Sequence, residues 1–129
     1  MRERDLERVR EALSQREEIL FAYLFGSAAE RRDSELSDVD IAIYLDPSLP
    51  RVRMLEVLAE IASELEPRLK VDLVLLNTAS PSLAFEAIRG RPIVLRDEGA
   101  LKEFVYRTLK VYHDRRYYDL RWARTVLER

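Results

Sequence analysis

Apolar residues along this chain form two kinds of pattern. Four short runs are almost continuously apolar, which is typical of buried strands. They are residues 19–25 (ILFAYLF), 38–45 (DVDIAIYL), 70–76 (KVDLVLL) and 92–95 (PIVL). The first run stops at Gly26, and the last is short enough to form an edge strand.

Elsewhere the apolar residues recur every three or four positions, which predicts amphipathic helices. Two stripes fall in the first half of the chain: Leu6, Val9 and Leu13, and then Met54, Leu55, Leu58, Ile61, Ala62 and Leu65, ended by Pro67. A short helix is expected from Pro81 to about Arg89, where Gly90 breaks it. A long last helix begins near Gly99, with Leu101, Phe104, Val105, Thr108, Leu109 and Tyr112 on one face. Ser27 stands where a further helix would have its N-cap.

The order of these elements predicts a single domain over residues 1–129. We expect its core at about 5–110 and a helical tail at 111–129 that could bind a partner or pack on the core. The length of 129 residues and the 47% hydrophobic content suit one buried core. There is no cysteine, which excludes a thiolate zinc site and a cysteine nucleophile. The charged start MRERDLERVREAL is unlike a signal peptide, so the expected compartment is the cytoplasm.

Charge is balanced overall but unevenly spread. The formal net charge is −2, which argues against direct DNA binding through bulk electrostatics. Residues 106–129, in contrast, carry an excess of arginine and lysine over acids, together with Tyr112, Tyr117, Tyr118 and Trp122. Arginine with aromatic residues is the usual composition of binding hot spots, although the same residues could complete the domain's own core. His113, the one histidine, is given no catalytic role.

Three aspartates interrupt the predicted strands, where aspartate is disfavoured. Side chains alternate along a strand, so Asp38 and Asp40 point to one face. If the strand carrying Asp72 lies beside theirs, three carboxylates converge, and a divalent cation would relieve their repulsion. Hard oxygen ligands suit Mg²⁺ or Mn²⁺. An EF-hand is excluded, because Ile43 and Leu49 stand where that loop needs glycine and glutamate.

The strand before them ends in Gly26-Ser27, ten residues upstream of Asp38. A glycine followed by a helix N-terminus offers backbone N–H groups to a phosphate. With Gly26-Ser27, Ser37-Asp38-Val39-Asp40-Ile41 and Val71-Asp72-Leu73 in order on strands, the chain resembles the minimal nucleotidyltransferase (MNT) family of the DNA polymerase β superfamily. The resemblance covers about residues 5–110.

The resemblance implies an α/β (α+β) fold: a small mixed sheet of three to four strands, flanked by helices, with a long C-terminal helix. It also implies that Asp38 and Asp40 bridge two Mg²⁺ ions bound to the phosphates of ATP. Asp72 would complete the site of the metal that activates the attacking hydroxyl, or accept its proton. Gly26 and Ser27 would hold the outer phosphates. A departure from the family is Glu30, in a stretch where many relatives carry a basic residue. Glu30 leaves rate and nucleotide choice in doubt.

The acceptor is less sharply defined. Stand-alone members resemble the antitoxin of HEPN/MNT toxin–antitoxin pairs, which implies transfer of AMP to a tyrosine of a HEPN ribonuclease toxin. Two alternatives stay open: a nucleotidyltransferase acting on a small molecule such as an antibiotic, and a non-catalytic antitoxin that acts by binding. Homo-oligomer formation also stays open.

Overall fold

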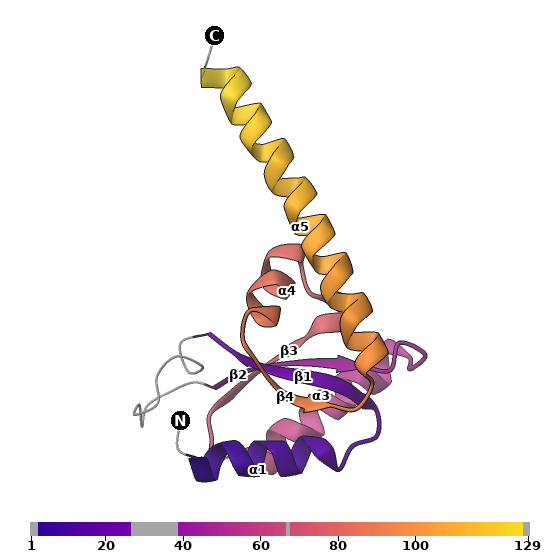
Figure 1. Cartoon of the computed structure of the whole chain (residues 1–129). Helices are drawn as coiled ribbons and strands as arrows, with labels where there is room; N and C mark the ends of the chain where they lie inside the picture. The colour runs from indigo at the N-terminus through magenta and orange to yellow at the C-terminus, as the bar shows by residue number, and fades with distance from the viewer. Residues whose placement is uncertain (1–2, 27–38, 67, 128–129) are drawn as a thin grey trace.

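The computed structural model describes residues 3–26, 39–66 and 68–127, with side chains through His113 except that of Val39. The described elements follow each other along the chain as Figure 1 labels them. They are α1 (Glu3–Ser14), β1 (Ile19–Phe25), β2 (Val39–Leu45), α3 (Arg51–Leu65), β3 (Val71–Leu75), the 3-10 turn η1 (Leu76–Thr78), α4 (Pro81–Ile88), β4 (Arg91–Leu95) and α5 (Glu98–Leu127). The predicted strands agree with the observed ones to within one residue at each end, and the predicted stripes of the first two helices begin three residues after the observed helices start.

The strands form one four-stranded mixed sheet in the order β3-β2-β1-β4. β1 pairs antiparallel with both β2 and β4, while β2 and β3 are parallel. The mixed sheet and the α/β class predicted from the sequence are confirmed. β1 is central and buried along nearly its whole length, which explains why its sequence is apolar without alternation.

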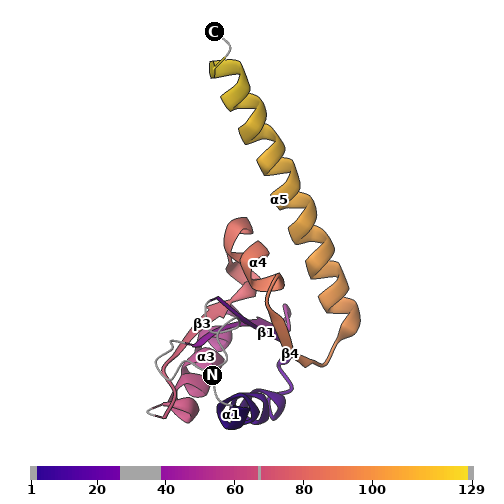
Figure 2. The same cartoon turned by 60° about the vertical axis from the view of Figure 1, so that its left-hand side comes forward.

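Helices cover the two faces of the sheet differently (Figures 1 and 2). α1 and α3 lie on one face, over a cluster that includes Val9, Leu13, Ile41, Ile43 and Ile61. α4 and the first part of α5 lie on the other face, over a second buried cluster. This cluster consists of Phe21, Tyr23, Phe25, Ala42, Tyr44, Leu76, Ala84, Ala87 and Phe104. We call these the α1/α3 face and the α4/α5 face.

Two predicted helix stripes differ in detail from the structure. In α3 the buried residues are Met54, Val57, Ile61 and Leu65, whereas Leu55, which the sequence placed in the stripe, is 57% exposed. In α5, Phe104 and Thr108 are buried but Leu109 is 45% exposed. Leu109 is exposed because α5 leaves the body of the domain and extends beyond it (Figure 1).

Two arginine side chains connect the outer elements of the fold through hydrogen bonds. Arg16, after α1, donates hydrogen bonds to Glu60 and Glu64 of α3 at 3.0 and 2.6 Å. Arg96, after β4, donates to the backbone carbonyls of Ile19, Ser14 and Arg16. None of the described helices combines the length and apolar character that crossing a bilayer requires.

Candidate functional site

Two of the predicted aspartates lie side by side at one end of the sheet. Asp40 and Asp72 are register partners in the parallel pair β2–β3. Neighbouring strands are about 4.8 Å apart, and register partners point to the same face. That face is the α4/α5 face, because Ala42 and Val74, two residues further along the same strands, pack in its cluster. The strand adjacency on which the sequence interpretation depended is present in the structure, and the register places Asp40 beside Asp72.

Gly26 lies against Asp40 and has no room for a side chain. It ends β1 with a φ of +77°, in the left-handed region that favours glycine. A Cβ atom built there would overlap the carboxylate Oδ2 of Asp40 and lie 3.2 Å from its Cγ. The preceding residue, Phe25, pairs with Asp40 across the β1–β2 ladder. Because Gly26 has no side chain, its backbone lies directly against the Asp40 carboxylate. Backbone N–H groups bind phosphates and carboxylates bind cations, so this arrangement suits a phosphate chain together with its cation.

A second glycine, Gly90, packs closely against the same end of β1. A Cβ on Gly90, between α4 and β4, would lie 2.8 Å from the Cβ of Phe25 and overlap the carbonyl oxygen of Leu24. The close approach holds the turn after α4 against the end of β1. The sequence predicted Gly90 only as a helix breaker, because a contact across the sheet leaves no local signal.

The structure thus brings together Gly26, Asp40 and Asp72. Asp40 is half-buried and Asp72 is exposed. Asp38 and Ser27, the other two predicted site residues, lie outside the described residues. Among the described residues there is no group of three or more His, Cys, Asp or Glu side chains placed to hold a metal ion.

The structural role of Asn77, at the end of this sheet, was not predicted from the sequence. The side chain of Asn77, in η1, donates from Nδ2 to the carbonyl of Leu45 at 2.8 Å and accepts from its N–H at 2.9 Å. This pair of bonds continues the β2–β3 ladder beyond the last strand residue. A signal was available: an amide side chain directly after an apolar strand is suited to such a contact.

Comparison with known proteins agrees with the geometry. The family model "Polymerase beta, Nucleotidyltransferase" matches residues 7–99. Comparison with curated proteins gives no match. Among solved structures, a toxin–antitoxin complex with AMP-PNP is 22% identical with a TM-score of 0.71, covering 95% of this chain and 98% of that one.

Two further structures are similar over nearly the whole chain. One is a tri-AMPylated Shewanella oneidensis HEPN toxin in complex with MNT antitoxin, at 22% identity and a TM-score of 0.68, covering 98% of this chain and 99% of that chain. The other is the toxin–antitoxin MntA-HepT, at 22% identity and a TM-score of 0.65, covering 95% and 97%. At these identities the likeness establishes a shared fold.

Proposed function

We propose that this chain, which belongs to the polymerase beta nucleotidyltransferase family, transfers AMP from ATP to a hydroxyl of a partner protein. The acceptor is a tyrosine of a HEPN-type ribonuclease toxin, and the chain acts as its antitoxin. The observation that carries the proposal is the register of Asp40 beside Asp72, with Gly26 clearing the space against Asp40.

The donor set fits Mg²⁺. Two carboxylates about 5 Å apart at the backbone offer hard oxygen ligands, which Mg²⁺ prefers. Asp40, together with Asp38 as the resemblance implies, would hold the ions bound to the phosphates of ATP, and Asp72 would complete the site of the ion that activates the hydroxyl. The cation would supply charge neutralisation for the phosphates and a lowered pKa for the attacking hydroxyl.

The chain's own residues then position and deprotonate. The backbone at Gly26 and Ser27 holds the outer phosphates in line with the acceptor. The acceptor oxygen bonds to the α-phosphorus of ATP, the bond from that phosphorus to the bridging oxygen breaks, and pyrophosphate leaves. Asp72, which is exposed on β3, would activate the hydroxyl through its metal ion or accept the hydroxyl proton itself.

The similar structures support the choice of nucleotide and acceptor. One of those proteins is described with AMP-PNP, an ATP analogue, and another with a tri-AMPylated HEPN toxin. Their agreement with this chain over nearly its whole length makes the same donor and the same class of acceptor the best-supported choice here.

The helical tail is the proposed contact with that partner. Tyr106 is 67% exposed and Leu109 45% exposed on α5, just before the predicted tail 111–129. Aromatic and aliphatic residues left exposed in a row mark interaction surfaces. On this proposal Trp122→Ala leaves the melting temperature near that of the wild type and weakens partner binding. A large loss of stability with normal binding would instead assign the tail to the domain's own core.

The transfer itself is tested with a HEPN-type protein as the candidate partner. The two proteins are incubated with Mg²⁺ and ATP, and the partner is analysed by intact mass and by fragment spectra. We expect the partner to gain AMP on tyrosine, with no gain when the chain carries Asp40→Ala. Modification of a small molecule only, or inhibition of the partner without any added mass, would contradict the proposal.

A further inference from the structure

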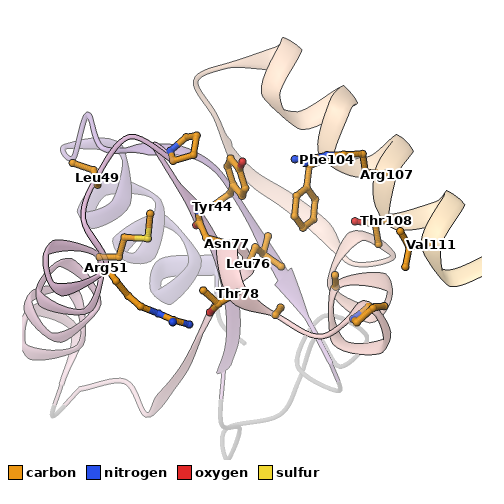
Figure 3. Close-up of a pocket in the computed structure, with 15 residues that line it drawn as sticks. Tyr44, Leu49, Arg51, Leu76, Asn77, Thr78, Phe104, Arg107, Thr108 and Val111 are labelled. Atoms are coloured by element: carbon orange, nitrogen blue, oxygen red, sulfur yellow. The ribbon is translucent and has the colours of Figure 1, made fainter.

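A cleft opens from the α4/α5 face at the end of the sheet away from the aspartates, and the start of α3 forms its other side. Its volume is about 610 Å³, within the range of sites that bind a drug-sized ligand or a short peptide. Figure 3 shows side chains from the end of β2, the start of α3, η1 and α5 around it. Its apolar surface is formed in part by Tyr44, Met54, Leu76, Phe104 and Val111.

The charge of this cleft is one-sided. Arg51, from the first turn of α3, and Arg107, from α5, line it, and no aspartate or glutamate among the described residues does. Both arginines are exposed, and neither forms an ion pair with another residue of the part of the chain that the structure describes. By contrast, Arg53, two positions along α3, pairs with Glu18, Glu56 and Glu60. We call this site the arginine cleft.

The arginine cleft is separate from the candidate nucleotidyl-transfer site but shares its face of the sheet. Neither Gly26, Asp40 nor Asp72 lines it. Tyr44 lies four residues after Asp40 on β2, which is about 13 Å along a strand. Ala84 of α4 lines the cleft, whereas Gly90, after the same helix, packs at the Phe25 end of the sheet. α4 therefore runs between the two sites.

We propose that the arginine cleft docks an acidic segment of the acceptor protein, with carboxylates on Arg51 and Arg107 and an apolar side chain against Tyr44 and Phe104. The inference rests on the proposed function. Guanidinium groups bind carboxylates through paired, charge-assisted hydrogen bonds, and these two have no competing acid in the cleft. A segment docked there lies about four extended residues from Asp40, which would bring a neighbouring tyrosine to the reacting phosphate.

The chemistry of the lining favours a peptide over a second nucleotide. Reading a base requires polar groups that are free to donate or accept. Asn77, the one amide among the described lining residues, has both ends of its side chain bonded to the backbone of Leu45, which leaves only the hydroxyls of Tyr44, Thr78 and Thr108 beside the two arginines. An acidic peptide requires two cations and an apolar floor, and the cleft supplies both.

The test needs no identified partner. A phage library of random dodecapeptides is selected on the full chain and, in parallel, on Arg51→Glu, Arg107→Glu and a control, Arg4→Glu. Arg4 is an exposed arginine of α1, remote from the cleft. We expect peptides rich in Asp and Glu around an aliphatic or aromatic residue from the wild type and the control. In fluorescence polarisation, the selected peptide should bind each cleft variant about tenfold or more weakly. The neutral variants Arg51→Gln and Arg107→Gln should show the same direction of change and guard against misfolding.

Three results would overturn the inference: peptides without acidic bias, equal binding by the cleft variants and the control, or displacement of the peptide by Mg²⁺–ATP. The last would assign the cleft to the nucleotide. Because peptide selection requires no catalysis, its outcome is separate from that of the transfer assay. Acidic selection with no AMP transfer would reject the proposed function alone, and transfer without acidic selection would reject the docking alone.

Discussion

The two faces of the sheet differ in how completely they are covered. On the α1/α3 face, α1 and α3 bury Val9, Leu13, Val57 and Ile61 fully, and ion pairs from Arg16 close the edge between them. On the α4/α5 face the helices cover the middle of the sheet, with the aspartate pair beyond one end of α4 and the arginine cleft at the other. Both faces bury a hydrophobic cluster, but only the α4/α5 face leaves the candidate site and the arginine cleft accessible at its two ends.

The largest expected effect is on the α4/α5 face and concerns rate. Asp72→Asn keeps the volume of an exposed side chain but removes the charge that would hold a metal and accept a proton. We expect transfer to the partner to fall about 100- to 10,000-fold, the usual contribution of a catalytic acid or base. Melting temperature and ATP binding should change little. Single-turnover kinetics with labelled ATP measure the rate, and an unchanged rate would show that another group is the third carboxylate.

The α1/α3 face should respond in the opposite way. Ile61→Ala removes a fully buried side chain from the middle of α3 and should lower the free energy of unfolding by about 2–5 kcal/mol. Leu55→Ala, on the exposed side of the same helix, is the matched control and should stay within about 0.5 kcal/mol. Urea titrations measure both. A large loss from Leu55 and a small one from Ile61 would reverse our assignment of the covered surface.

Gly26→Ala should affect both stability and the site, by a smaller amount. The new methyl group would require a left-handed φ of an L-residue and would displace the Asp40 carboxylate. We expect a loss of about 1–3 kcal/mol in unfolding free energy, together with weaker ATP binding. Gly99→Ala is the control, since its Cβ would meet only Asp97 Oδ1, at 3.4 Å, near the start of α5. Equal behaviour of the two variants would mean that Gly26 does not need to be glycine.

The smallest expected effect is the pH dependence of the ion pairs on the α1/α3 face. Hydrogen bonds from Arg16, and then from Arg53, lower the pKa of Glu60 from its ordinary value of 4.5. A lowered folded-state pKa stabilises the protein above the ordinary value, and this contribution is lost as pH falls through the folded pKa. The difference in melting temperature between wild type and Glu60→Gln should therefore be small at neutral pH and vanish once the pH falls below the folded-state pKa of Glu60. A difference that grows in acid would contradict this sign.

The sequence predicted the local features of this fold well and its long-range contacts less well. The run ILFAYLF coincides with β1, because a short, continuous apolar run that ends at a glycine is stable as a strand buried on both faces of a sheet. The pairing of the strands that carry Asp40 and Asp72 stayed a condition at the level of the sequence, and the structure supplies it as a parallel pair, the usual arrangement of two strands joined by one helix. The α3 stripe was partly wrong at Leu55, since helical periodicity alone does not fix which neighbouring residue faces the core.

The arginine cleft could not be predicted from local patterns. Arg51 and Arg107 are far apart in the sequence and line one cleft only because α3 and α5 begin near the same end of the sheet. The same holds for the bonds between Asn77 and Leu45. Gly26 was singled out for its place before a predicted phosphate-binding helix, and the structure adds a second reason, the contact with Asp40.

The central claim is that the carboxylates beside Gly26 bind ATP through a divalent cation. Calorimetric titration of ATP into the full chain, with Mg²⁺ and then with a chelator, tests it directly. We predict binding that requires Mg²⁺ and drops in Asp40→Ala and in Asp38→Ala, while Leu55→Ala binds as the wild type does. Equal, metal-independent binding by the wild type and both aspartate variants would contradict the account.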